Sequence, residues 1–236
     1  MKKFLKATAM LLALAAMFTV AGCKTNADDE NQLPGKWSTS AEFYDIVNYR
    51  GYLNRTGNTI TYELKDPQTN WAKTVTPGKF QTNSLPVTKY SNFTGFKAKA
   101  SANSGDSGCG FVFNWNTKTN TDGTDSYSYY YLIIQEKYIF LEEIIDGVDT
   151  PLLGTGDDAW KYCSSLKEEP SENTIIVFKD KDGSIVIKIN NEVAHIIQNP
   201  KLKSGAFGVI CSCGGKDQAA NITITAKYKF LEFQIE

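Results

Sequence analysis

The sequence predicts an all-β protein built as a β-sandwich. The strongest evidence is the segment Asn221–Phe233, in which apolar and polar residues alternate, as in a strand with one buried face. A second observation is a pair of β-type runs, Thr174–Lys179 and Ser184–Asn190, separated by the turn-like residues Asp180–Gly183. From Pro34 onward, short runs of this kind recur between Gly, Asn, Asp and Pro clusters. About ten strands with at most one short helix indicate a sandwich.

Each element follows from the same patterns. In the last strand the side chains expected to face the core are Ile222, Ile224, Ala226, Tyr228 and Phe230. A turn at Arg55–Asn58 separates two earlier strand-like runs. The remaining strands are expected at Phe93–Ala100, Gly110–Trp115, Tyr127–Gln135, Tyr138–Ile145 and Gly205–Cys211. One short helix is expected at Asp157–Leu166, because acids begin it, Ala159, Cys163 and Leu166 form a stripe, and Pro170 follows its end.

The region from about Phe80 to the end resembles the concanavalin A-like jelly roll of laminin G-type, lectin and glucanase-related domains. The resemblance rests on the hairpin and final strand of residues 173–233, and on GCGFVF at 108–113 followed by YYYLII at 129–134. The hairpin ends in Asn190-Asn191, where many relatives have Asn-Gly, and asparagine tolerates the positive φ of such a turn. These motifs are structural, so the resemblance implies a fold rather than a function.

The first 23 residues predict export and lipid attachment. Lys2, Lys3 and Lys6 precede an apolar run at Ala7–Val20, which has the length of a signal peptide. Val20-Ala21-Gly22-Cys23 then resembles the bacterial lipobox, in which the cysteine is lipidated. We therefore expect a signal peptide at 1–22, a lipidated Cys23 with a polar tether to residue 33, and a sandwich domain at 34–236. Lys24, where some bacteria place a retention aspartate, favours the outer membrane or cell surface.

Charge and cysteine content narrow the function further. Removal of the three signal-peptide lysines, with no acids, takes the formal net charge from -1 to -4, which argues against a nucleic-acid partner. Four of the five cysteines then remain for two disulfides. Cys211 and Cys213 share a strand face and cannot readily bond each other, so each is expected to pair with Cys109 or Cys163. Free buried thiols are the alternative.

Catalytic signals are weak. Glucanases of the resembling superfamily carry Glu-x-Asp-x-x-Glu on one strand, whereas Glu142 and Glu143 here are adjacent and would point to opposite faces. A catalytic carboxylate pair formed by Glu136 and Glu142 across neighbouring strands is the remaining alternative. His195, the single histidine, lies in a strand-like segment and is expected to be a structural or surface histidine. The cofactor prediction is none, with calcium left open because related domains bind it at loop acids, here Asp122, Asp125, Asp149, Asp157, Asp158 and Asp180–Gly183.

Aromatic residues carry the binding hypothesis. The chain has 12 tyrosines, 13 phenylalanines and 4 tryptophans, and aromatic rings can stack on the faces of sugars. The residues chosen as ligand contacts are Trp115, Tyr129, Tyr131 and Trp160. The sequence thus favours a non-catalytic module that binds a glycan or an envelope or host protein. A glycoside hydrolase of the same fold and a structural subunit of an envelope complex are the alternatives.

Overall fold

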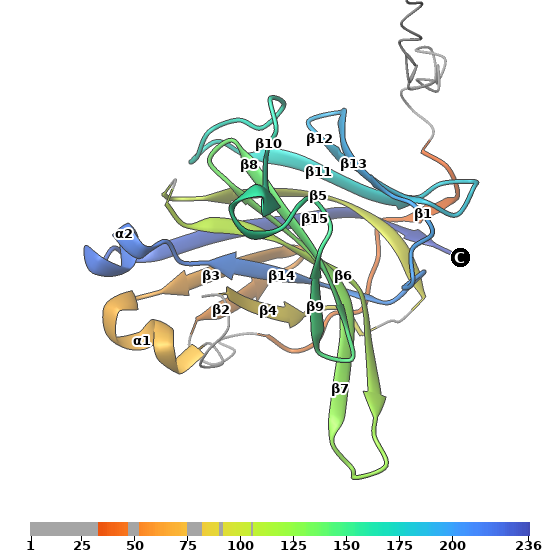
Figure 1. The fold of residues 1–236 in the computed structure, drawn as a ribbon, viewed down its shortest axis with the longest axis horizontal. Coiled ribbons are helices and arrows are strands. Elements are labelled where there is room, and N and C mark those ends of the chain that lie inside the picture. The colour runs from red at the N-terminus through yellow and green to blue at the C-terminus, as the bar shows by residue number, and fades with distance from the viewer. Residues whose placement is uncertain (1–32, 47–51, 75–81, 90–91, 105) are drawn as a thin grey trace, which may run out of the picture. The chain divides into compact units, whose positions relative to one another are not determined.

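Two antiparallel β-sheets stack face to face (Figure 1). The computed structural model describes residues 33–46, 52–74, 82–89, 92–104 and 106–236. The expected signal peptide, Cys23 and nearly all of the tether lie outside these residues. Pro34–Glu236 forms one compact unit, so the sandwich is described by itself below.

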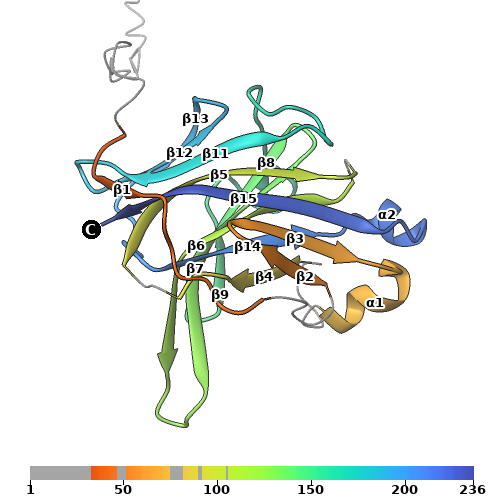
Figure 2. The ribbon, with the colours of Figure 1, turned by 180° about the vertical axis from the view of Figure 1, so that it is seen from behind.

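One sheet has eight strands, in the order β13-β12-β11-β5-β15-β3-β2, with β1 also paired to β15. Its strands are β1 (Lys36–Ser38), β2 (Leu53–Thr56), β3 (Thr59–Leu64), β5 (Phe93–Ala102), β11 (Asn173–Lys179), β12 (Ile185–Ile189), β13 (Glu192–Ile197) and β15 (Ile224–Ile235). Strand β15 lies between β5 and β3, so the last strand of the chain is a central strand of this sheet (Figure 2).

The other sheet has seven strands, in the order β10-β8-β7-β6-β14-β4, with β9 also paired to β8. Its strands are β4 (Thr82–Pro86), β6 (Gly108–Thr119), β7 (Asp125–Gln135), β8 (Tyr138–Ile145), β9 (Val148–Pro151), β10 (Trp160–Tyr162) and β14 (Ala206–Ser212). The β6–β7 hairpin extends beyond the other strands (Figures 1 and 2). We call the side of this sheet that faces away from the eight-stranded sheet the outer face.

Phenylalanine and tyrosine rings fill the space between the sheets. Phe96 of β5 is fully buried, and its ring centroid lies 4.9 Å from that of Phe111, 5.0 Å from Phe207 and 5.8 Å from Phe230. These rings come from both sheets and meet at tilted or edge-on angles, the arrangement that aromatic quadrupoles favour. The core therefore fixes which side of each strand faces inward.

The expected alternation of the last strand is confirmed within β15. Ile224, Ala226, Tyr228 and Phe230 are buried, while Lys227 and Lys229 between them are exposed. Ile222 is the exception, because it precedes the strand and is exposed. The turn at Asn190-Asn191 is also as expected, with φ angles of 49° and 73°.

The expected helix at Asp157–Leu166 is wrong. Residues Gly156–Ala159 form a single 3₁₀ turn, and Trp160–Tyr162 is strand β10, which pairs with β8. The residues of the expected stripe separate accordingly, because Ala159 packs on the outer face while Cys163 and Leu166 reach the core. Two short helices occur elsewhere, α1 (Pro67–Thr74) and α2 (Gly215–Ala219), so the limit of one helix is also wrong. In the described part of the chain no helix has the length and hydropathy to cross a membrane.

The two expected disulfides are not formed in this structure, in which Cys109, Cys163, Cys211 and Cys213 are buried free thiols. Cys109 and Cys211 are register partners on β6 and β14, and both face the core. Cys163 lies beyond β10, where its sulfur is 3.2 Å from Ser165 Oγ. The alternative of free buried thiols describes this structure.

Replacement of the central ring tests this account of the core. We expect Phe96→Ala to lower the free energy of unfolding by about 3–5 kcal/mol, because the deleted ring leaves a cavity among packed aromatics. Lys99→Ala, on the opposite side of the same strand, should cost less than about 1 kcal/mol. Urea unfolding followed by tryptophan fluorescence measures both, and equal losses would contradict the central role of Phe96.

Candidate functional site

The outer face of the seven-stranded sheet carries a second apolar cluster, separate from the core. Its buried members are Val112, Tyr131, Ile133, Phe140, Ile144, Ala159 and Ile210. Trp115, Tyr129 and Trp160 pack against them and are half-buried. An outward-facing sheet surface normally carries polar side chains, so this concentration of apolar and aromatic residues needs an explanation.

Five rings of this cluster form a continuous series, which we call the aromatic row. Trp115 stacks on Tyr129 with ring centroids 4.2 Å apart and planes 11° from parallel. The series continues from Tyr129 to Tyr131 (6.2 Å), from Tyr131 to Phe140 (5.8 Å) and from Phe140 to Trp160 (5.2 Å). The structure thus places all four residues chosen from the sequence on one face.

A β-bulge turns Trp115 to the outer face. Phe113 pairs with Tyr130 and Asn116 pairs with Ser128, so two residues, Asn114 and Trp115, lie opposite Tyr129 alone. Asn114 has a φ of 52°. Its side-chain nitrogen donates a hydrogen bond to the Leu202 carbonyl at 2.9 Å. Because a bulge shifts the alternation by one residue, Trp115 leaves the core side that Phe113 occupies.

Tyr131 lies beneath the accessible surface. It is only 6% exposed, and its hydroxyl donates a hydrogen bond to Glu142, its register partner on β8. Burial, together with the hydrogen bond to Glu142, raises the pKa of Tyr131 above its ordinary value, so the hydroxyl stays protonated. Tyr131 therefore supports the neighbouring rings and is too deeply buried to contribute a stacking surface.

Three further tyrosines extend the exposed aromatic area at both ends of the row. Tyr127 is 43% exposed, and its ring lies 5.4 Å from that of Trp115. Near Trp160, Tyr138 and Tyr162 are 41% and 59% exposed and form an edge-to-face pair at 5.8 Å. Tyr138 was missed as a site residue in the sequence, although its two-residue spacing from Phe140 indicates the shared face.

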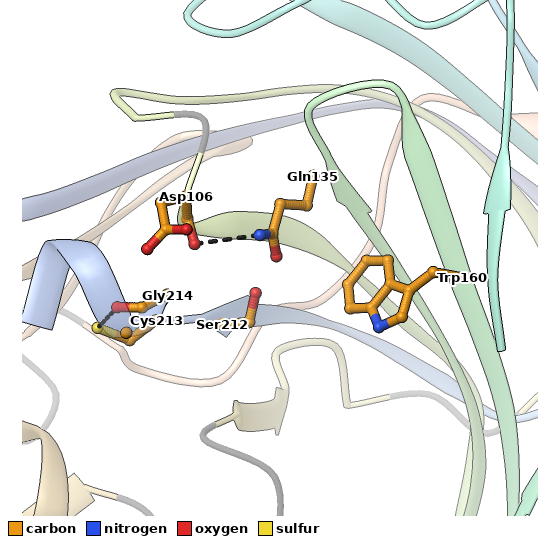
Figure 3. Close-up of a pocket in the computed structure, with 7 residues that line it drawn as sticks. Asp106, Gln135, Trp160, Ser212, Cys213 and Gly214 are labelled. Atoms are coloured by element: carbon orange, nitrogen blue, oxygen red, sulfur yellow. Dashed lines mark hydrogen bonds between the residues drawn. The ribbon is translucent and has the colours of Figure 1, made fainter. Parts of the chain in front are cut away.

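A hollow of about 390 Å³ lies beside Trp160 (Figure 3). It is lined by Asp106, Gln135, Trp160, Ser212, Cys213, Gly214 and Gly215. Ser212 pairs with Gly108 across β14 and β6, and an added Cβ at Gly108 would lie 2.6 Å from Ser212 Oγ. A side chain at Gly108 would therefore crowd Ser212, one of the residues that line the hollow. Sequence reasoning missed this hollow, and its signal is Gly108-x-Gly110 in a strand.

Polar groups of the hollow are held in place by hydrogen bonds. Gln135 Nε2 donates to the Asp106 carbonyl at 3.2 Å, as the dashed line in Figure 3 shows. The Asp106 carboxylate accepts the backbone N–H of Lys216 at 2.7 Å, and Ser212 Oγ accepts that of Gly108 at 3.0 Å. The hollow thus presents oriented donors and acceptors next to an indole ring.

The glutamates considered as catalytic candidates lie in β8 and in the turn before it. Glu142 faces outward with Tyr131, whereas Glu143 faces inward, 2.5 Å from Lys201 Nζ and 3.1 Å from the Tyr130 hydroxyl. The two glutamates thus lie on opposite sides of the sheet, as expected. Glu136 lies in the β7–β8 turn, beyond Tyr138, and Tyr138–Glu142 alone spans about 13 Å of strand. The backbone spacing therefore argues against a Glu136–Glu142 catalytic pair.

The other candidates have structural surroundings. His195 is the register partner of the core residue Ile187, and burial lowers its pKa. The carboxylates of Asp122 and Asp182 accept bonds within their own turns, from Thr124 and Ser184. Within the described ranges, no group of three or more His, Cys, Asp or Glu side chains is placed to hold a metal ion.

Comparison with known proteins gives the fold a name. No protein-family model matches the chain, and no curated protein matches its sequence. A solved glycosidic hydrolase matches with a TM-score of 0.52 at 9% identity, over 86% of this chain and 97% of that one. The β-glucanase of Bacillus licheniformis matches with a TM-score of 0.50 at 12% identity, over 88% and 95%. The fold is a concanavalin A-like jelly roll. At these identities the likeness shows the fold alone, which confirms the prediction from sequence.

Glu169 has a buried carboxylate on which the charges of Glu136 and Asp217 act. Neither of its oxygens has a hydrogen-bond partner. Burial, and then the negative charges of Glu136 and Asp217, raise its pKa to about 8 from 4.5. Since the folded protein holds this proton more tightly than the unfolded chain, stability contributed by protonated Glu169 is lost as the pH rises from about 4.5 through 8.

We therefore expect Glu169→Gln to be more stable relative to wild type at pH 9 than at pH 5, with the difference changing by more than about 1 kcal/mol. Urea unfolding at pH 5, 7 and 9 measures it. The neighbouring exposed residue gives a matched control, Glu168→Gln, which should follow wild type at every pH. A wild-type–variant difference that does not change with pH would refute the assignment to Glu169.

Proposed function

We propose that this protein is an exported, lipid-anchored envelope protein that binds a glycan on the outer face of its seven-stranded sheet without cleaving it. One observation carries the proposal. The aromatic row ends at two half-exposed indoles, Trp115 and Trp160, and a hollow with oriented polar groups adjoins the second. Apolar rings next to hydrogen-bonding groups are the combination that sugar faces and sugar hydroxyls require.

The fold supports a sugar-related role in a coarser way. The solved structures of similar fold are a glycosidic hydrolase and a β-glucanase. Because one fold can host many functions, the proposal rests on the residues of the site, and the fold is only consistent with it.

Glycoside hydrolysis is the second candidate, and one observation favours it. Asp149 pairs with Ile144 and Pro151 pairs with Glu142, so Asp149 and Glu142 occupy diagonal positions on the outer face, about 7–8 Å apart. From backbone positions at this spacing, two carboxyl groups can reach the separation of about 6.5–9.5 Å that an inverting pair requires. Against it, Glu142 is 8% exposed and already accepts the Tyr131 hydroxyl, whereas Asp149 is open to solvent. Release of reducing sugar by wild type, lost in both Glu142→Gln and Asp149→Asn, would decide for the enzyme.

A glycan array followed by calorimetry on the bound glycan tests the binding proposal. We expect Trp160→Ala and Trp115→Ala each to weaken binding by about tenfold or more, because each removes an exposed stacking surface. Trp37→Ala is the matched control, since Trp37 is a half-buried tryptophan on β1 of the other sheet. Wild-type affinity in both outer-face variants, with unfolding midpoints unchanged, would contradict the proposed site.

The anchor is tested separately. We expect Cys23→Ser to remain uncleaved at the Gly22–Cys23 bond and to lose metabolic labelling with a radioactive fatty acid, because the thiol that carries the lipid is gone. Detergent-phase partitioning of the two forms gives the second readout. Equal lipid labelling of the variant and wild type would refute the lipobox assignment.

A further inference from the structure

The β6–β7 hairpin continues past the other strands of its sheet (Figures 1 and 2). The pairing of β14 with β6 reaches Trp115, and the pairing of β8 with β7 reaches Tyr129. Beyond them, residues 117–127 form a turn and two strand ends that pair only with each other in the described part of the chain. We call this segment the ribbon. Most of its residues are exposed, so both of its faces are open to solvent.

The ribbon adds little to the stability of the fold. None of its described residues belongs to either apolar cluster, and a two-stranded hairpin without apolar packing is marginal in water. Hydrogen bonds nevertheless define its tip, where the Asp122 carboxylate accepts the backbone N–H of Thr124 at 2.9 Å and the N–H of Asn120 donates to the Thr124 carbonyl at 2.7 Å. A regular arm that the core does not require is a candidate for contact with a ligand.

One face of the ribbon continues the outer face of the sheet. Because side chains alternate along a strand, residues two and four positions beyond Trp115 and Tyr129 share their side. These residues, all exposed, are Thr117, Thr119, Asp125 and Tyr127. The ring of Tyr127 lies 5.4 Å from that of Trp115, so the ribbon begins in contact with the aromatic row.

The aromatic row runs toward the ribbon. Trp160 is the register partner of Phe140, which pairs in turn with Ile133 of β7. Tyr129, at the other end of the row, lies four residues before Ile133, about 13 Å along the strand. The row therefore crosses the sheet diagonally, and the same diagonal continued past Tyr129 leads to Tyr127. A glycan chain that follows the row reaches the outer face of the ribbon.

That face offers hydrogen-bonding groups next to the Tyr127 ring. The Thr119 hydroxyl donates to Asp125 Oδ1 at 2.8 Å, which orients the carboxylate on this side. The second carboxylate oxygen and the Thr117 hydroxyl are groups that bind sugar hydroxyls. Lys118, by contrast, is the register partner of Ser126 and lies on the opposite side of the ribbon.

We propose that the ribbon is a second part of the glycan site, which binds sugar units beyond Trp115 and so selects long glycan chains over short ones. The inference rests on the proposed glycan-binding function and names its ligand class. A short glycan contacts the aromatic row alone. In a longer chain the units that follow are already tethered beside the ribbon, so their hydrogen bonds add affinity without a second loss of translational freedom.

Calorimetry with oligosaccharides of increasing length, cut from a polysaccharide that binds on the array, tests the proposal. We expect the affinity to rise by about tenfold or more once the chain is long enough to pass Trp115, because hydrogen bonds to the ribbon then form. The same or lower affinity for long chains overturns the proposal and leaves glycan binding intact. Binding of no glycan at any length overturns the proposed function and this inference with it.

Two double variants separate contacts with the ribbon from chain length itself. Thr119→Ala with Asp125→Ala removes a register pair on the outer side, and Lys118→Ala with Ser126→Ala removes the adjacent pair on the opposite side. All four side chains lie on the solvent-exposed ribbon, so both variants should fold.

We expect the outer-side variant to bind long chains about tenfold more weakly than wild type and short chains as wild type does. The opposite-side variant should match wild type for both lengths. Equal affinities of the two variants for long chains overturn the proposal.

Discussion

The aromatic packing between the sheets is the constraint on which the rest of the structure depends. Phe96, Phe111, Phe207 and Phe230 occupy one contact region from both sheets, so the inward side of each central strand is assigned. Side chains in a strand alternate between the two faces of the sheet, so those that do not point into the core must face outward. The outer face of the seven-stranded sheet thus inherits a fixed set of side chains, including Tyr127, Tyr129 and Tyr131.

Within that constraint, the bulge at Asn114 changes one assignment. A regular strand would place Trp115 on the same side as Phe113, inside the sandwich. The extra residue reverses its direction, and the indole stacks on Tyr129. The left-handed backbone of Asn114 and its bond to Leu202 hold this irregularity in place, so a local departure from regular pairing builds one end of the proposed binding surface.

The sequence predicts most of the fold because the alternation of apolar and polar residues shows which side of each strand is buried. Strand β8 has the expected bounds, and β15 differs mainly in beginning at Ile224. The helix at Asp157–Leu166 fails because pairing with β8 overrides a weak local pattern of acids and spaced apolar residues. The aromatic candidates meet on one face, yet the direction of Trp115, the depth of Tyr131 and the hollow at Asp106 all depend on tertiary pairing. The two-residue alternation of the sequence alone predicts none of these three features.

The central claim is that a glycan lies along the aromatic row. The most direct measurement is the indole N–H region of a ¹⁵N spectrum, in which the four tryptophans give separate signals, recorded during titration with a glycan that binds on the array. The account predicts that the signals of Trp115 and Trp160 shift with the same apparent Kd while that of Trp37 stays in place. A shift of Trp37 with Trp115 and Trp160 unchanged would contradict it.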